Sequence, residues 1–384
     1  MVDQVSGRVD SAFRAVRDRF EASFADGQNL GAGVAVYVGG RLVVDLWGGT
    51  ADATTGRAWE RETPCVTFSC TKAVTATAAL RVGAHAGVSM NAPVASWWPE
   101  YACAGKESTT TADLLAHTAG LPAFDRPISP REAADPELMA SILATQTAVW
   151  EPGTRHGYHA LTFGWLAGEF VRRHAGTTVG EYTRRHLNAD LHIGPAGPVL
   201  EQTARLASPP AVEAKWTGDS APIDSETVTR MARAYADPNS LIMRSTTNPR
   251  GSYNKPEVLT GGWPAAGLVT TAGAFASFYR DLIAGALLPP HILDDAISER
   301  VRGRDEVLLL ESAYGLGYAR ASQNMPLPPA ARETAFGHPG AGGSIAIGDI
   351  DHQVAFAFVP NLRRDWLSGD RRAYRLIEAV YAAL

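Results

Sequence analysis

Strand-like patterns lie at both ends of this chain, and helical patterns fill the long stretch between them. Near the start, two β-branched runs within residues 31–49 are joined by two glycines, which is typical of a tight hairpin. Three more strand-like runs follow in the last third of the chain, at 312–320, 344–350 and 353–361. The pattern predicts one sheet built from the two chain ends, with a helical lobe inserted between them.

Helical periodicity predicts the principal helices of the chain. Apolar residues recur at helical spacing over residues 8–26, and an alanine-rich run at 69–84 is typical of a buried helix. A last helix is predicted at 370–383. Two irregular stretches, 121–136 and 240–262, exceed the usual length of a connection, which is typical of lids and binding loops.

Composition excludes several functional classes. Of the 384 residues, 45% are hydrophobic and 20% are charged, which allows a sizeable core and excludes extensive disorder. The formal net charge of −5 argues against nucleic acid or an anionic membrane as the main partner. No apolar run approaches the ~18 residues that a membrane helix needs. The charged N-terminal stretch also lacks the apolar centre of a secretory signal.

The cysteines and histidines give no sign of a metal site. Cys65, Cys70 and Cys103 form a sparse set without metal-ligand spacing, so a reducing cytoplasm fits best. His156 and His159 have no acidic neighbour at the spacing of a metal ligand. The common nucleophile-elbow, phosphate-loop and dinucleotide motifs are absent as well. We therefore predict a cytoplasmic protein that uses neither a metal nor a cofactor.

Ser69 and Lys72 form an S-x-x-K motif at the predicted start of the alanine-rich helix. Residues three apart share one face of a helix, so the lysine amine can reach the serine hydroxyl, as a base must reach its nucleophile. Burial near the positive end of a helix would lower the pKa of the lysine toward that of a useful base. On the motif alone, a helix cap followed by a solvated lysine is an equally open interpretation.

Further blocks accompany this motif in a fixed order along the chain. They are FSCTK at 68–72, LAHTAGLP at 115–122, EPGT at 151–154, Tyr158, LHIG at 191–194 and FGHPGAGGS at 336–344. In this order the blocks resemble the serine β-lactamase-like proteins, and most of all the family VIII carboxylesterases, a group of class C β-lactamase-like esterases and transesterases. The resemblance extends from about residue 31 to residue 361.

The resemblance implies an α+β fold of the β-lactamase/D,D-peptidase type, in which helices flank an antiparallel sheet. Together with the strand pattern, it assigns residues 1–66 and 257–384 to a sheet domain. Residues 67–256 are assigned to a mainly helical domain. We expect the active site at the junction of the two domains.

The resemblance also implies roles for individual residues. Ser69 corresponds to the nucleophile and Lys72 to its base. Tyr158 corresponds to a tyrosine that passes protons between nucleophile and leaving group, and a neighbouring lysine cation should lower its pKa. A core tyrosine in a helix at 156–173 is the alternative for Tyr158. The asparagine that class C β-lactamases carry two positions later is Ala160 here, which argues against efficient β-lactam hydrolysis.

His338 stands where the β-lactamases carry the lysine of a Lys-Thr-Gly motif on a strand that lines the site. Histidine at this position removes a permanent cation and favours a less anionic, ester-like substrate. A packing role under the site is the alternative for His338. Ala341 should supply the second oxyanion N–H beside that of Ser69. Gly340 and the glycines after it would let the backbone approach a substrate closely.

Aromatic residues near the flanking loops are candidates for the substrate pocket, and each of them is equally typical of a core position. The candidates are Trp150, Trp263 and Tyr318, with Tyr314 and Phe124 as further members of the set.

These residues predict a serine carboxylesterase that works through a covalent acyl-enzyme on a small-molecule ester. The main alternative is an acyltransferase of the same fold, which passes the acyl group to an alcohol or amine. A β-lactamase or D,D-peptidase fits less well, because the asparagine and the lysine are missing. A binding module without catalysis is disfavoured by the intact Ser69, Lys72 and Tyr158. We expect neither a nucleic-acid nor a membrane partner.

Overall fold

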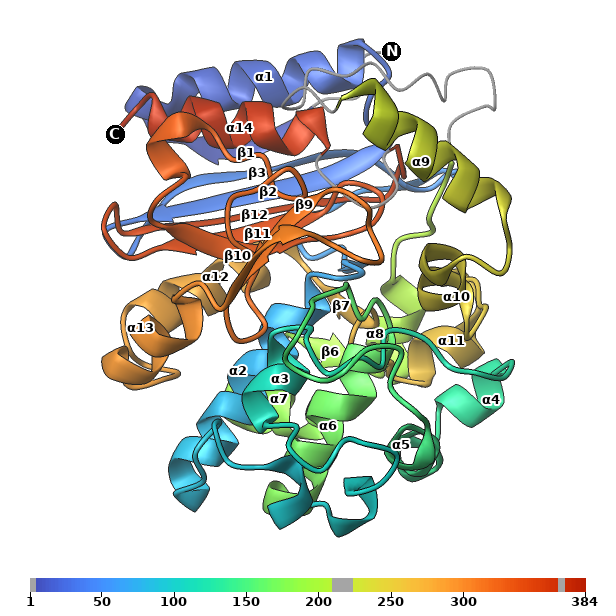
Figure 1. Cartoon of the computed structure of the whole chain (residues 1–384). Helices are drawn as coiled ribbons and strands as arrows, with labels where there is room; N and C mark the ends of the chain where they lie inside the picture. Colours follow the sequence, from blue (N-terminus) through green and yellow to red (C-terminus); the bar gives the residue numbers. More distant parts are fainter. Residues whose placement is uncertain (1–4, 209–223, 365–369) are drawn as a thin grey trace.

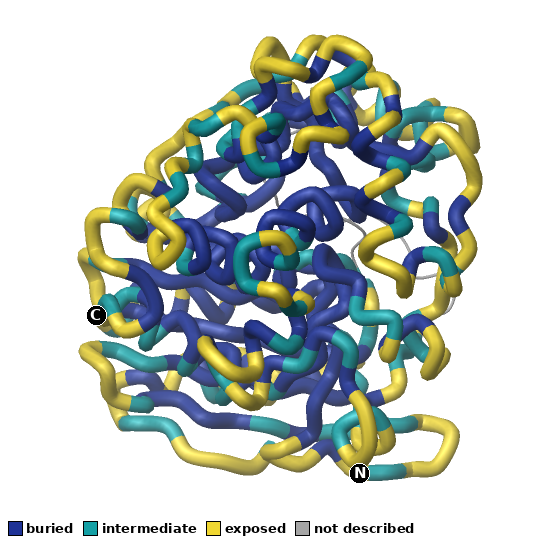
Figure 2. Tube along the Cα trace, turned by 90° about the horizontal axis from the view of Figure 1, so that it is seen from below, coloured by how far each residue is buried: buried dark blue, intermediate teal, exposed yellow. Residues whose placement is uncertain are grey.

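The structure is a computed structural model that describes residues 5–208, 224–364 and 370–384. One large sheet lies in the upper half of Figure 1, with helices α1 (Arg14–Ala25) and α14 (Arg371–Tyr381) above it. Most of the other helices lie below the sheet. Figure 2 shows buried chain through the interior of the molecule and exposed chain at its periphery.

The large sheet joins the two ends of the chain, which confirms the predicted architecture. The strands β2 (Gly31–Val38) and β3 (Arg41–Asp52) form the hairpin, and β12 (Val354–Pro360) pairs with the other edge of β2, with Ala35 opposite Ala357. All pairings along this sheet are antiparallel. In the order β1-β3-β2-β12-β11-β10, the remaining strands are β1 (Ser6–Val9), β11 (Ile345–Asp349) and β10 (Ala335–Pro339).

Helices cover both faces of the central strands, so these strands are apolar on both sides rather than alternating. Val34 and Val36 belong to a buried cluster that includes side chains of α1 and α14. Ala35 and Ala357 belong to a second cluster, together with Phe275 of α12 (Ala272–Ile283). Alanines on the second face allow α12 to lie close to the sheet.

Helix α2 (Thr71–Ala86) runs through the centre of the helical part and is buried on nearly all sides. It packs on α6 (Thr162–Ala175) and α7 (Val179–His186). Because neighbours surround it, small residues are favoured around its whole circumference, and the alanine-rich sequence follows from this. The described parts of the chain contain no helix that is both long enough and apolar enough to cross a membrane.

The remaining helices and strands are mostly short. They are η1 (Ser11–Phe13), β4 (Arg57–Ala58), β5 (Cys65–Val66), η2 (Val94–Ser96), η3 (Pro99–Tyr101), α3 (Thr111–Leu115), α4 (Pro130–Ala133), α5 (Pro136–Thr145), β6 (His192–Ile193), α8 (Gly197–Gln202), α9 (Ser225–Ala236), α10 (Leu241–Thr247), α11 (Pro256–Thr260), β7 (Leu268–Thr270), α13 (Pro290–Ile297), β8 (Val301–Arg304), β9 (Glu311–Tyr314) and η5 (Pro329–Ala331).

A small sheet in the order β5-β7-β6 connects segments that we assign to different domains. The strands β5 and β7 come from the predicted sheet domain, whereas β6 comes from the predicted helical domain. We keep residues 1–66 with 257–384 and residues 67–256 as the proposed domain boundaries.

Several predicted elements differ in extent from the structure. The helix predicted over 8–26 begins only at Arg14, because Ser6–Val9 pair with β3 at the edge of the sheet, which helical periodicity cannot reveal. The strand predicted over 312–320 ends at Tyr314, because the chain folds back there and Ala319 pairs with both Tyr314 and Gly337.

The two stretches predicted to be irregular contain short helices. Helix α4 lies within 121–136, and α10 and α11 lie within 240–262. Each of these helices has at most seven residues, which is too short for a clear helical period in the sequence. Two of them begin at a proline, which favours the first turn of a helix.

The side chain of Asn361 joins segments that are far apart in the sequence. Its Oδ1 accepts a hydrogen bond from the Gly31 N–H at 2.9 Å, and its Nδ2 donates to the carbonyls of Thr50, Ala51 and Arg205 at 3.0, 3.2 and 3.1 Å. The side chain is fully buried at the end of β12. A buried amide of this kind leaves backbone groups unsatisfied when it is removed.

We predict that Asn361→Leu lowers the free energy of unfolding by about 2–4 kcal/mol, because buried backbone groups lose their partner while the volume is nearly kept. Urea unfolding followed by circular dichroism measures the change. Asn239→Ala is the control, since Asn239 is exposed and the expected change is within about 0.5 kcal/mol. Equal changes in the two variants would show that Asn361 does not anchor the fold.

Candidate active site

Ser69 sits in a tight turn directly before α2. The preceding residue, Phe68, has a φ of +49°, which is uncommon for a side chain of this size. Thr71 stabilises the turn, because its hydroxyl donates to the Phe68 carbonyl and accepts from the Leu268 N–H at 3.0 Å. The turn places Ser69 on the wall of a pocket of about 450 Å³.

Lys72 lies one helical turn after Ser69 and is fully buried. Its Nζ lies 3.3 Å from Ser69 Oγ, 2.7 Å from the Ala160 carbonyl oxygen and 3.1 Å from the Ala265 carbonyl oxygen. Burial disfavours the ammonium form and holds the pKa of Lys72 well below its ordinary value. Within the described residues, no carboxylate forms an ion pair with this amine. Burial therefore favours the neutral form of the Lys72 amine, which is the form that a base needs.

The two carbonyls determine how that neutral amine is oriented. A carbonyl oxygen can only accept, so Ala160 and Ala265 take the two N–H groups of the amine. In the neutral amine the nitrogen lone pair is then left for Ser69 Oγ, at 3.3 Å, whereas the ammonium form would donate a proton to the same oxygen. This is the arrangement that proton transfer from a serine nucleophile requires.

Tyr158 lies in the irregular segment before α6, which corrects the alternative that placed it inside a helix at 156–173. Its hydroxyl forms a hydrogen bond with the Ser69 side chain, and its ring lies 4.6 Å from Lys72 Nζ. Burial raises the pKa of Tyr158 more strongly than the hydrogen bond from Ser69 lowers it. The prediction that the pKa of Tyr158 would fall was wrong, because burial penalises the phenolate.

Asp305 fixes the backbone of Tyr158 and was not identified from the sequence. Its carboxylate accepts hydrogen bonds from the N–H groups of Tyr158 at 3.0 Å and of Val307 and Leu308 at 2.8 Å each. The hydroxyl of Ser312 donates to the same carboxylate at 2.8 Å. An Asp at the start of a turn is a visible sequence signal. The contact with Tyr158 spans more than a hundred residues and leaves no such signal.

Strand β10 and the glycine turn after it press against the start of α2. The thiol of Cys70 donates to the His338 carbonyl at 3.1 Å, and the hydroxyl of Ser344 donates to the Thr67 carbonyl at 2.8 Å. A Cβ atom on Gly340 would lie only 2.3 Å from the Thr67 carbonyl oxygen, so glycine is required at this contact. The contact brings residue 341 to the same pocket wall as Ser69.

The N–H groups of Ser69 and Ala341 belong to residues that line one pocket. In the portions of the chain that the structure describes, neither N–H meets a protein acceptor with hydrogen-bonding geometry. Two free donors beside a nucleophile are what a developing oxyanion needs. The geometry thus agrees with the roles expected for both residues.

His338 lies behind Tyr158 and does not line the pocket. It is buried, its ring lies 5.9 Å from that of Tyr158, and its Nδ1 lies 2.7 Å from the Pro339 carbonyl oxygen. Burial lowers the pKa of His338 to about 3, so the ring is neutral near pH 7. Its position fits the packing alternative better than a substrate contact.

The pocket is lined by aromatic side chains other than the predicted ones. Trp150 donates from Nε1 to the Thr118 carbonyl at 3.1 Å, and the Tyr318 hydroxyl lies 2.7 Å from Thr77 Oγ1. Trp263 packs behind Tyr253, at 5.7 Å between ring centroids. The described residues that line the pocket are Phe68, Ser69, Tyr158, Ala160, Leu161, Leu206, Ser208, Tyr235, Thr246, Thr247, Gly251, Ser252, Tyr253, Asn254, Ala266, Ala341 and Arg363.

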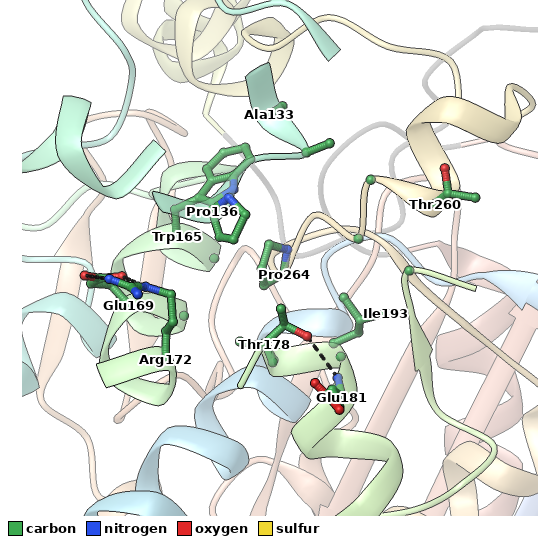
Figure 3. Close-up of a pocket in the computed structure, with 18 of the residues that line it drawn as sticks. Ala133, Pro136, Trp165, Glu169, Arg172, Thr178, Glu181, Ile193, Thr260 and Pro264 are labelled. Atoms are coloured by element: carbon green, nitrogen blue, oxygen red, sulfur yellow. Dashed lines mark hydrogen bonds and ion pairs between the residues drawn. The ribbon is translucent and has the colours of Figure 1, made fainter. Parts of the chain in front are cut away.

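A separate pocket of about 300 Å³ lies between α5, α6, α7 and the loop before β7 (Figure 3). Trp165, Pro136 and Pro264 form part of its apolar wall, and Glu169 and Arg172 pair with each other at one side. Ser69 is not among its lining residues. No group of three or more potential metal ligands is found in the described residues.

A sequence model of the beta-lactamase family matches residues 16–381. The chain belongs to the beta-lactamase family. This result confirms the resemblance and the predicted α+β fold.

Relatives within the beta-lactamase family match nearly the whole chain. Esterase/beta-lactamase LipL of Mycobacterium tuberculosis is 30% identical over 377 residues, which are 93% of this chain and 83% of that protein. The crystal structure of a family VIII carboxylesterase is 28% identical with a TM-score of 0.87, covering 99% of this chain and 100% of the other. A penicillin-binding protein homologue from Caulobacter crescentus is 34% identical with a TM-score of 0.85 and the same coverage.

We predict that Lys72→Arg is nearly as damaging as Lys72→Ala, with a loss of kcat/KM on the order of 10²–10⁴. Arginine keeps a positive charge but cannot give up its proton at working pH. Steady-state hydrolysis of a nitrophenyl ester measures the loss, and Lys255→Arg, at an exposed lysine, is the matched control. An active Lys72→Arg enzyme would mean that the residue supplies only a cation.

The pH dependence of acylation follows from the same lysine. A base must be deprotonated, so the acylation rate should rise with pH through the pKa of Lys72, and burial places that pKa well below 10.5. Single-turnover acylation across a pH series measures the midpoint. A midpoint near 10.5 would contradict the neutral buried amine.

We predict that Tyr158→Phe affects esters unequally. The phenol donates a proton to a leaving alkoxide, so alkyl esters should lose far more activity than nitrophenyl esters, whose leaving group departs without a proton. The ring volume is retained, so the melting temperature should change little. Rates across a series of leaving groups, with a thermal melt of the same variant, provide the test. Equal losses together with a large drop in melting temperature would assign Tyr158 to the core alone.

Proposed function

We propose that the protein is a serine hydrolase that cleaves carboxylic esters through an acyl-enzyme on Ser69. The observation that carries this proposal is the buried Lys72 amine, which lies 3.3 Å from Ser69 Oγ and is held there by two backbone carbonyls. It occurs on the wall of a pocket that is large enough for a small ester.

In the proposed acylation, Ser69 Oγ attacks the ester carbonyl carbon while its proton moves to Lys72 Nζ. The N–H groups of Ser69 and Ala341 stabilise the negative oxygen of the tetrahedral intermediate. As the carbon–oxygen bond of the ester breaks, the Tyr158 phenol gives its proton to the leaving alkoxide. The phenolate regains a proton from the Lys72 ammonium, and water then removes the acyl group by the reverse sequence.

The relatives support an ester substrate. The family VIII carboxylesterase and LipL, an esterase/beta-lactamase by name, both match nearly the whole of this chain. The chain also differs from class C β-lactamases at Ala160, whose carbonyl binds Lys72, and at His338, which is neutral. Both substitutions remove groups that would hold a β-lactam. We therefore propose ester hydrolysis in preference to β-lactam hydrolysis.

Acyl transfer is the second candidate. The chemistry of acylation is identical, and the pocket of about 450 Å³ has room for an alcohol or amine beside the acyl group. A nitrophenyl butyrate assay with and without an added alcohol or amine separates the two. A transferase forms the new ester or amide, which chromatography detects, whereas a hydrolase releases only the free acid.

The three cysteines are unpaired thiols, which agrees with the reducing cytoplasm that we propose for the protein. The partner that we propose is a small-molecule ester.

We predict that Ser69→Ala abolishes both ester hydrolysis and covalent labelling by a fluorophosphonate probe, because the attacking oxygen is gone. Intact-protein mass spectrometry measures the labelling, and circular dichroism checks that the fold is retained. Ser141→Ala, on the exposed face of α5, is the control that keeps full labelling. Labelling of the Ser69→Ala protein at another serine would remove Ser69 from the nucleophile role.

A further inference from the structure

The described part of the pocket beside Ser69 carries one charged side chain. Among the described residues that line it, Arg363 alone carries a charge, and the others are aromatic, aliphatic, hydroxyl or amide groups. Arg363 is exposed at the edge of the pocket and pairs with no carboxylate of the described residues, so its positive charge can attract an anion.

The base of Arg363 is fixed by backbone hydrogen bonds. Its N–H donates to the Ala207 carbonyl at 2.9 Å, and the Ala207 N–H donates to the Asn361 carbonyl at 2.9 Å. Asn361 is the buried residue that joins the ends of the sheet to the segment at Arg205. The Cα atom of Arg363 therefore has a defined position at the rim of the pocket.

The aliphatic part of Arg363 packs on the turn that carries the oxyanion donor. A Cβ atom on Gly342 would lie 2.8 Å from Arg363 Cγ, so the turn leaves space for the arginine only because residue 342 is glycine. Gly342 directly follows Ala341. The first carbons of the Arg363 side chain thus lie against the turn that follows Ala341, and both residues line the same pocket.

The guanidinium of Arg363 is largely uncommitted, in contrast to that of a second arginine near the same turn. Among the described residues, its guanidinium donates one hydrogen bond to a side chain, that of Ser208 (Oγ at 3.4 Å), and no carboxylate pairs with it. Arg372, by comparison, is buried and is paired with Asp370, and it also donates to the Gly342 carbonyl at 2.9 Å. Arg372 supports the turn, and Arg363 keeps its charge available.

We propose that Arg363 binds a carboxylate of the substrate, so that the preferred substrates are esters carrying a second, ionised carboxyl group. This inference rests on the proposed ester hydrolysis at Ser69. The planar guanidinium can hold a carboxylate through two parallel hydrogen bonds. Histidine at position 338 removes one cation from the site, whereas Arg363 supplies another, packed against the turn that follows Ala341.

Isosteric pairs of esters test the proposal, with one member anionic and the other neutral. For a carboxylate on the acyl side, mono-4-nitrophenyl adipate is compared with its carboxamide analogue. For a carboxylate on the alcohol side, the butyrate ester of 3-hydroxybenzoate is compared with that of 3-hydroxybenzamide. The measured quantity is the ratio of kcat/KM values, anionic over neutral, at low and high salt. The two pairs show which side of the ester carries the carboxylate.

We expect the wild-type ratio to favour the anionic ester in at least one pair. Arg363→Gln should lower that ratio roughly ten-fold, as expected for loss of a charged hydrogen-bonding partner. Arg363→Lys should retain part of the ratio, and Arg363→Glu should invert it. Added salt should reduce the ratio in the wild type more than in Arg363→Gln. Arg205→Gln is the matched control, because Arg205 is exposed and lies outside the lining.

Three results would overturn the proposal: no anionic preference in the wild type, a preference that survives Arg363→Gln, or an equal loss in Arg205→Gln. The third would show that overall charge steers the substrate without a specific contact. Failure of the proposed function is recognised separately. In that case the neutral esters are not hydrolysed either, and the fluorophosphonate probe does not label Ser69.

Discussion

The contact of the Lys72 amine with two carbonyl oxygens is the constraint on which the site depends. An unpaired lysine is costly to bury, and that cost is reduced here because burial favours the neutral amine and two carbonyl oxygens accept hydrogen bonds from it. Ala160 lies in the segment before α6, and Ala265 lies in the loop before β7. Burying α2 on nearly all sides thus serves the chemistry as well as the packing, because water at Lys72 would restore the ammonium ion.

Neutral side chains also surround the phenol of Tyr158. His117 lies 5.1 Å from its ring and Tyr314 stacks on it at 6.1 Å between centroids. Burial lowers the pKa of His159 to about 4 and that of His338 to about 3, and it holds the pKa of His117 well below its ordinary value. These three buried histidines therefore favour the neutral form near pH 7. Tyr158 stays protonated and suited to donating a proton.

Sequence reasoning succeeded where the information is local or periodic. The glycine hairpin, the buried alanine-rich helix and the spacing of Ser69 and Lys72 depend on neighbours within a few residues. The support of Tyr158 by Asp305 and the placement of Arg363 beside Gly342 depend on contacts across the fold, which no local pattern encodes. The prediction of pocket residues from large aromatics was unreliable, because large aromatics are also typical of the core. Trp150 and Trp263 are buried core residues.

The pairing of β2 with β12 has a consequence for how the chain is made. The hairpin of β2 and β3 leaves the ribosome early, but the strand that covers its open edge begins at Val354. Until then, β2, whose residues 31–36 are buried in the finished sheet, has an unpaired apolar edge, which is the kind of surface that aggregates. The nascent protein must carry this exposed edge through synthesis of nearly its whole length, so fragments truncated before β12 should depend on chaperones to stay in solution.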